Sequence, residues 1–176
     1  GLRPDKAMSD LLAYVLCEYG ERTIAPMTEC FYTALARPTY QEEFYVGKME
    51  SEHEIIMCVL TGIASPACTE LFLAFFNERE GFSENYLYLC KHLLDVVGKT
   101  KSEKLVEPIM DLLRFEQKII GGDPAFMKKI FKAIGQLGRK ADAAALASRF
   151  NAAAEDRPDV LLAYEATLAR LEKKKA

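Results

Sequence analysis

The chain has 176 residues, 50% of them hydrophobic and 28% charged, and its 23 Lys and Arg against 26 Asp and Glu give a net charge of −3. This apolar content can offset the entropy lost on ordering the chain, which excludes intrinsic disorder, and the low Gly and Pro content excludes a collagen-like or linker-like chain. The length predicts a single domain over residues 1–176. We expect it to be a fragment of a longer chain, because it opens on Gly1-Leu2 without a methionine.

The residues favour helix along almost the whole chain. Ala, Leu, Glu, Lys and Met dominate, and alternating runs of β-branched residues are absent. Asp123-Pro124 predicts a helix start, and Asp156-Arg157-Pro158 predicts a break before the last helix. Short connections between the predicted helices are typical of antiparallel helical hairpins, and we expect about eight or nine helices. The candidate spans are 8–19, 23–36, 40–47, 51–61, 66–78, 84–97, 102–118, 124–136, 140–154 and 158–174.

Four glycines recur between helix-like runs, at spacings of 42, 36 and 40 residues: Gly20, Gly62, Gly98 and Gly138. The residues four and five positions before each glycine, and 12 positions after it, are apolar in all four units. Each glycine is predicted to end a first helix in a left-handed cap, so that Gly138→Val costs about 1 kcal/mol or more. Ala25, Ala67 and Ala143, each five residues after a glycine, are predicted to let the second helix approach closely.

Units of this kind stack into an all-α, right-handed array of antiparallel helical hairpins, an α-solenoid of about four repeat units. This is the fold class that the sequence predicts. The alternative is an irregular all-α bundle whose glycines fall between helices by coincidence.

The last unit is the most regular, with the turn Leu137-Gly138-Arg139 followed by Ala143. Over residues 126–150 it resembles a pentatricopeptide or tetratricopeptide repeat, and the other three units resemble it loosely. The resemblance implies stacked helical hairpins that bind RNA or protein segments. The positions at which pentatricopeptide repeats read bases hold residues outside that family's code, and the Trp of tetratricopeptide repeats is missing, so the resemblance supports the architecture more than either ligand. Those positions are Asp10, Glu52, Tyr88 and Lys128.

No pattern in the sequence forms a catalytic or cofactor-binding signature, so we expect no enzymatic activity and no cofactor. Neither His53 nor His92 has the close Cys or His spacing of a zinc site, and we expect no metal. His92 is predicted to be a partly buried packing residue. Gly98-Lys99-Thr100 copies the end of a phosphate-binding loop, but Leu93 stands where that loop needs a glycine.

The chain has five cysteines, an odd number without paired spacing: Cys17, Cys30, Cys58, Cys68 and Cys90. Each lies in an apolar run, which predicts reduced thiols in an intracellular reducing compartment, namely the cytoplasm, the nucleus or the mitochondrial matrix. No stretch reaches the roughly 18 apolar residues that span a bilayer, so we expect no membrane partner.

Aromatic and acidic residues close together in the sequence form the predicted protein interface. Aromatic side chains are enriched at protein interfaces, and an acidic patch suits a basic partner. We therefore predict a non-enzymatic protein-binding scaffold, an adaptor subunit that holds other protein subunits in a larger assembly. The alternatives are aromatic residues that fill the core and glutamates on solvated helix faces. The interface candidates are Tyr40, Phe44, Tyr45, Glu50, Glu52 and Glu54.

Basic residues gather around the fourth glycine. They support an alternative function, an RNA-binding pentatricopeptide-like module in organellar RNA processing or translation. The net negative charge argues against it, because phosphate contacts usually require a basic domain. Ordinary solvated helix faces explain the same residues. The RNA-contact candidates are Lys128, Lys132, Arg139 and Lys140.

Overall fold

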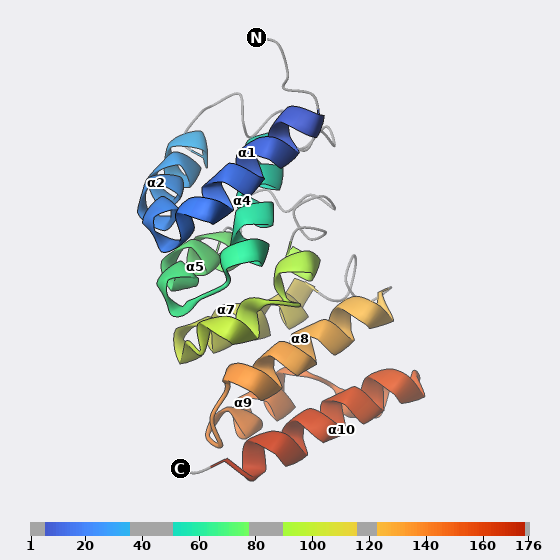
Figure 1. Cartoon of the computed structure of the whole chain (residues 1–176). Helices are drawn as coiled ribbons and strands as arrows, with labels where there is room; N and C mark the ends of the chain where they lie inside the picture. Colours follow the sequence, from blue (N-terminus) through green and yellow to red (C-terminus); the bar gives the residue numbers. More distant parts are fainter. Residues whose placement is uncertain (1–5, 36–50, 78–89, 116–122, 175–176) are drawn as a thin grey trace. The chain divides into compact units, whose positions relative to one another are not determined.

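The computed structural model describes residues 6–35, 51–77, 90–115 and 123–174 (Figure 1). Over these ranges the chain is all-helical, with eight α-helices and no β-strand, which confirms the predicted all-α class. The chain divides into two compact units, Gly1–Thr100 and Lys101–Ala176. We describe each unit separately.

In the first unit, four α-helices pack in two pairs. They are α1 (Lys6–Tyr19), α2 (Ile24–Leu35), α4 (Ser51–Ile63) and α5 (Thr69–Asn77). Helix α1 packs along α4, and α2 packs against α5, as Figure 1 shows. Short 3-10 turns join the members of each hairpin: η1 (Gly20–Thr23) follows α1, and η2 (Pro66–Cys68) follows α4. The main helix–helix contacts of this unit are therefore those of α1 with α4 and of α2 with α5.

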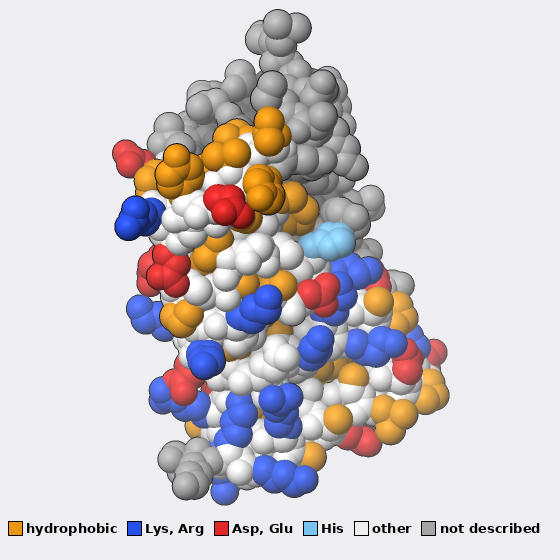
Figure 2. Space-filling model, in the orientation of Figure 1, with side chains coloured by type: hydrophobic (Ala, Val, Ile, Leu, Met, Phe, Trp, Pro, Cys, Tyr) orange, Lys and Arg blue, Asp and Glu red, His pale blue; other side chains and the backbone are white. Residues whose placement is uncertain are grey.

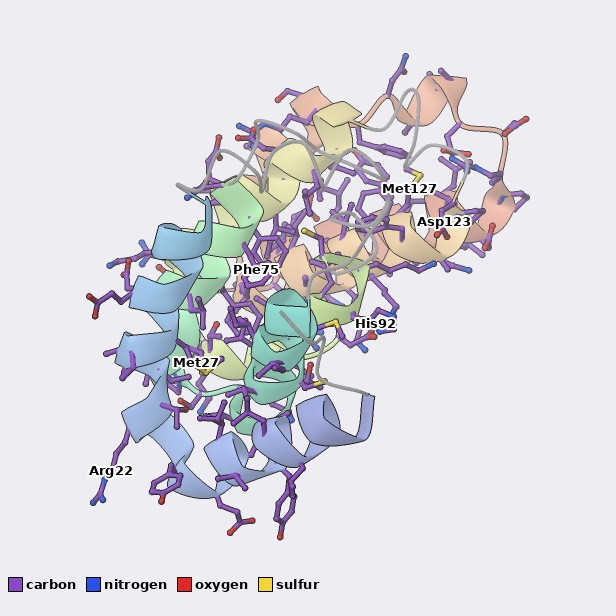
Figure 3. The ribbon with its side chains drawn as sticks, turned by 90° about the horizontal axis from the view of Figure 1, so that it is seen from above. Arg22, Met27, Phe75, His92, Asp123 and Met127 are labelled. Carbon is purple, nitrogen blue, oxygen red and sulfur yellow. The ribbon has the colours of Figure 1, made fainter. Side chains whose placement is uncertain are left out.

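The core of the first unit is built on α5. Phe72, Phe75 and Phe76 are fully buried, and the rings of Phe72 and Phe76 stack with their centroids 6.2 Å apart. Val59 and Leu60 of α4 are buried as well. Figure 3 shows the side chain of Phe75 inside the unit. These phenylalanines are therefore core residues of the first unit.

In the second unit, α8 lies at the centre of the packing. The elements are η4 (Glu103–Leu105), α7 (Val106–Asp111), η5 (Leu112–Phe115), α8 (Pro124–Leu137), α9 (Asp142–Arg149), η7 (Ala152–Ala154) and α10 (Pro158–Glu172). Helix α8 packs along α10 and against α7, and α9 contacts α10. The apolar residues of α8 recur with the helical period, so one face of it is buried while Lys132 on the other face is exposed.

The two predicted helix starts in this unit are confirmed. Pro124 opens α8, and the carboxylate of Asp123 accepts a hydrogen bond of 3.1 Å from the backbone N–H of Phe126. Pro158 opens α10, after Arg157 in extended backbone. The predicted helix over 140–154, in contrast, ends at Arg149. There Phe150 adopts extended backbone, which directs its ring into the core.

The core of the second unit is an aromatic cluster from three elements. The ring centroid of Phe150 lies 5.0 Å from that of Phe131 on α8 and 4.8 Å from that of Tyr164 on α10. The hydroxyl of Thr167 lies 3.1 Å from the carbonyl oxygen of Phe131, which ties α10 to α8. Burial raises the pKa of the Tyr164 phenol. Edge and tilted ring contacts of this kind stabilise a core beyond the area that they bury.

The left-handed caps predicted at the recurring glycines are wrong at three of the four positions. Gly20 has a φ of +61°, but Gly62 lies inside α4, and Gly98 lies inside η3 (Val97–Thr100). Gly138 is extended, with φ −67° and ψ 165°. The positive φ values in the following turns belong to non-glycine residues, Ala64 at 33° and Lys101 at 55°. Turn chemistry therefore does not explain the glycine spacing.

Close approach of neighbouring helices explains two of these glycines instead. A Cβ on Gly62 would lie 2.6 Å from the sulfur of Cys17 on α1. A Cβ on Gly138 would lie 2.8 Å from the carbonyl oxygen of Ile134 and 2.9 Å from a methyl of Leu171 on α10. Both positions thus sit where α1 meets α4 and where α8 meets α10.

The alanines that follow the glycines do not all have the predicted role. Ala25 and Ala67 are exposed, so a larger side chain at either position meets solvent rather than a neighbouring helix, and the prediction of close approach is wrong there. Ala143 is half-buried. Close contact between helices is instead made at two of the glycines, five residues before these alanines. Gly62 lies against Cys17 of α1, and Gly138 lies against Leu171 of α10.

Candidate functional site

The predicted interface residues fall largely outside the part of the chain that the structure describes. Tyr40, Phe44, Tyr45 and Glu50 lie in 36–50, outside the described residues. Glu52 and Glu54 lie in the first turn of α4, but their side chains are not among those described. These six assignments remain predictions.

A different apolar surface is present on α1. Five of its large apolar side chains are between 40% and 65% exposed. We call this set the α1 surface: Leu11, Leu12, Tyr14, Val15 and Tyr19. Figure 2 shows hydrophobic side chains gathered over this helix. Among the described residues, the other exposed large hydrophobic side chain is Leu162 on α10, so the concentration on α1 is specific to that helix.

Helix α1 is apolar on two opposite faces. At 100° per residue, Leu11, Val15 and Tyr19 form one ridge, while Ala13 and Cys17 lie on the opposite side. Ala13 is buried, and Cys17 is the residue that meets Gly62 of α4. A helix that is apolar all round is normally covered on both sides. Here one side is covered by α4 and the other faces solvent.

Residues at equal offsets before the four recurring glycines can be compared with the exposed side of α1. Leu12, Val15 and Tyr19 lie eight, five and one positions before Gly20. The residues at the same offsets before Gly98 and Gly138 are 0% to 5% exposed: Cys90, Leu93, Val97, Ile130, Ala133 and Leu137. One position before Gly62 the residue is Thr61, which is polar and exposed. On α1 these positions hold apolar residues, as on the buried faces, but they are exposed to solvent.

Sequence reasoning missed this surface, although a signal for it was present. The segment from Leu11 to Leu16 contains only apolar residues, and the next charged residue is Glu18. That composition is typical of a helix that neighbours cover on more than one face. Only the packing shows which face α4 covers.

Basic residues predominate in the second unit. Residues 101–176 contain 15 Lys and Arg against 11 Asp and Glu, a net charge of +4, whereas residues 1–100 contain 8 against 15, a net charge of −7. Figure 2 shows Lys and Arg side chains over much of the visible face of the second unit. The overall charge of −3 is therefore the sum of an acidic first unit and a basic second unit.

Two of the four RNA-contact candidates are held in ion pairs. The ammonium of Lys128 lies 2.5 Å from a carboxylate oxygen of Asp159, and Arg139 pairs with Glu103. The Lys128 ammonium lowers the pKa of the Asp159 carboxyl. Lys132 and Lys140 are exposed. The charges of Lys128 and Arg139 are therefore already partly neutralised by carboxylates.

A buried arginine links α9 to α7. The guanidinium of Arg149 is mostly buried, hydrogen-bonds the carboxylate of Glu107 and lies 3.9 Å from a carboxylate oxygen of Asp111. The hydrogen bond to Glu107 raises the pKa of Arg149. Because these partners hold the side chain between two helices, we assign Arg149 a structural role in the second unit.

A second buried ion pair, before α10, gives a pH-dependent stability. The carboxylate of Glu155 is almost fully buried and accepts hydrogen bonds from Arg157 at Nε (2.5 Å) and Nη2 (2.7 Å). These bonds lower the pKa of Glu155 below its ordinary value of 4.5. A lowered pKa in the folded state stabilises the fold above about pH 4.5, and this contribution is lost as the pH falls through the folded-state pKa.

We expect Glu155→Gln to reduce the free energy of unfolding by about 1–2 kcal/mol at pH 7, because a charge-assisted hydrogen bond is weakened. The difference from the parent chain should shrink between pH 5 and pH 3, as Glu155 of the parent becomes protonated. Urea denaturation of both chains at several pH values measures this. A difference that stays constant from pH 7 to pH 3 would contradict the role assigned to the pair.

Over the described part of the chain, no cluster of three or more His, Cys, Asp or Glu is arranged to hold a metal ion. His92 is exposed, so its predicted role as a partly buried packing residue is wrong. The side chains of Cys68 and Cys90 are buried, and those of Cys17 and Cys58 are half-buried. In the described ranges, no helix combines the length and the apolar character needed to cross a bilayer.

Comparison with known proteins does not connect this site to a family. No protein-family model matches the chain, and neither a curated protein nor a solved structure matches it.

Proposed function

We propose that the chain is a non-enzymatic protein-binding scaffold, an adaptor that holds partner proteins within a larger assembly. The observation that carries this proposal is the α1 surface, with five large apolar side chains exposed on one helix. The largest contiguous apolar patch on a protein surface is often a functional contact site. Two of the five are tyrosines, which combine a large apolar ring with a polar group and are enriched in such contacts.

We propose further that the architecture is a right-handed array of helical hairpins of the pentatricopeptide or tetratricopeptide kind. The pairing of α1 with α4 and of α2 with α5 supports it, because corresponding helices of successive hairpins stack in such arrays. The packing of α8 along α10 follows the same rule in the second unit. The buried and half-buried thiols of Cys17, Cys58, Cys68 and Cys90 support a reducing compartment as its place of action.

A photo-cross-linking experiment tests the protein-binding function. A benzophenone amino acid replaces Tyr14 on the α1 surface in one variant and Leu162 on α10 in a matched control, since both positions are 65% exposed. On irradiation in an extract of the source cells, we expect defined protein adducts from position 14 that persist in 0.5 M salt, because apolar contacts are not screened. Position 162 should give none of them.

The same experiment can contradict the proposal. Identical adducts at the two positions, or none at position 14, would show that the α1 surface does not bind protein.

RNA binding is the second candidate function, favoured by the net charge of +4 on residues 101–176. Lys132 and Lys140 are the exposed candidates for phosphate contacts. The ion pairs of Lys128 and Arg139 count against it, because those side chains would have to leave a carboxylate to reach a phosphate. Binding of mixed single-stranded RNA that weakens steeply with salt, and is lost in Lys132→Glu with Lys140→Glu, would support RNA binding over the scaffold.

A further inference from the structure

We infer that the α1 surface binds a second copy of this chain, with two α1 helices packed antiparallel about a two-fold axis near Val15. The inference rests on the proposed protein-binding function and names the partner. Its first support is the register of the hairpins. At the positions of Leu12, Val15 and Tyr19, the residues before Gly98 and Gly138 are buried, whereas Thr61, the last of these positions before Gly62, is exposed and polar. The exposed side of α1 therefore has the pattern of a surface that another helix covers.

The area of the α1 surface is sufficient for a small dimer. Aromatic side chains bury about 150–250 Å² each, so the exposed parts of these five residues amount to roughly 500 Å² on one copy. Two copies then remove roughly 1,000 Å² from water, which is the lower limit for a specific interface. An interface of this size is typical of weak or transient association.

The charges on α1 suit an antiparallel pair. All five members of the α1 surface are uncharged, but the exposed Glu18 lies within the arc that they cover, between the directions of Tyr14 and Leu11. With the axis at Val15, the two Glu18 positions are six residues apart along the helix direction, or about 9 Å. A parallel pair would place the two carboxylates opposite each other. The antiparallel pair also sets each helix dipole against the opposite one.

The distribution of apolar residues favours a closed pair over a chain of many copies. A filament requires a second, complementary surface elsewhere on the molecule. Among the described residues outside α1, Leu162 is the exposed large hydrophobic side chain, and its neighbours Glu165 and Arg170 on the same helix are exposed and charged. One self-complementary surface produces an isologous dimer.

Charge variants at the axis test this inference directly. Val15 is 40% exposed, so Val15→Glu and Val15→Lys leave the core of the first unit intact. In sedimentation velocity between 1 and 100 µM, we expect the parent chain to form dimers that persist in 0.5 M salt. Each variant alone should be monomeric, with a Kd raised at least about 100-fold, because two like charges meet at the axis. An equimolar mixture of the two variants should form dimers again in low salt.

Recovery of dimers in the mixture also shows that both variants are folded. Leu162→Glu is the matched control and should dimerise like the parent chain, because it places a charge on an exposed apolar residue of α10, in the second unit. A parent chain that stays monomeric at 100 µM would overturn the inference, and so would dimers unaffected by Val15→Glu. If position 14 still cross-links to another protein in that case, the scaffold function stands and only the second copy is excluded as its partner.

Discussion

Phe131→Ala is expected to lower the free energy of unfolding of the second unit by about 3–5 kcal/mol. The ring of Phe131 is fully buried and contacts the rings of Phe150 and Tyr164, with centroids 5.0 and 5.8 Å away. Its removal takes away the apolar contacts of a large side chain and leaves a cavity among residues from three elements, which cannot all move together to fill it. The loss is a large fraction of the roughly 5–15 kcal/mol that stabilises a typical domain.

Urea denaturation of the full chain, followed by circular dichroism, measures this effect. Leu162→Ala on α10 is the matched control, because its side chain is 65% exposed and its removal should change the free energy of unfolding by about 0.5 kcal/mol or less. Phe131→Leu should retain part of the packing and lose less than Phe131→Ala. Equal effects of Phe131→Ala and Leu162→Ala would contradict the assignment of the aromatic cluster as the core of this unit.

The second large effect is expected at Gly138, where even one methyl group clashes. In Gly138→Ala the new Cβ would lie 2.8 Å from the carbonyl oxygen of Ile134, a backbone atom within the last turn of α8, and 2.9 Å from Leu171. The backbone of Gly138 is extended, so alanine accepts its dihedral angles. The cost comes mainly from the contact with the Ile134 carbonyl, a backbone atom of α8 itself, and in part from displacing the Leu171 side chain of α10. We expect a loss of about 1–3 kcal/mol, and a larger one for Gly138→Val.

Gly135, three residues earlier, provides a control of opposite sign. A Cβ there would meet Arg170 at 3.4 Å and Thr167 at 3.5 Å, which is ordinary van der Waals contact. Because Gly135 lies inside α8, Gly135→Ala should stabilise the second unit by about 0.5–1 kcal/mol through helix propensity. Thermal denaturation should then move in opposite directions for the two alanine variants. A shift in the same direction would show that the close approach at Gly138 does not govern its stability.

Local chemistry explains why several helix boundaries could be predicted from the sequence. Asp123 and Pro124 satisfy and shape the first turn of α8 by themselves, and Pro158 cannot continue a preceding helix, so both starts lie at the predicted residues. The end of α9 could not be predicted in this way. Residues 150–154 favour helix locally, but the burial of Phe150 between Phe131 and Tyr164 outweighs that preference.

The candidate site shows the same division. A run of apolar residues such as Leu11 to Leu16 specifies a helix with two apolar faces, but not which face a neighbour covers. That choice depends on where α4 lies, and α4 contacts α1 at the point where Gly62 leaves room for Cys17. The basic residues behave similarly, since the pairing of Lys128 with Asp159 joins residues 31 positions apart.

The sequence by itself determined the helical class and most helix starts, because these depend on side chains within a few residues of one another. The tertiary structure alone decided the role of Gly62 and Gly138, the end of α9 and the exposure of the α1 surface. Each of these depends on a contact, or on the lack of one, between segments far apart in the chain. Such contacts cannot be predicted from the spacing of residues along one helix.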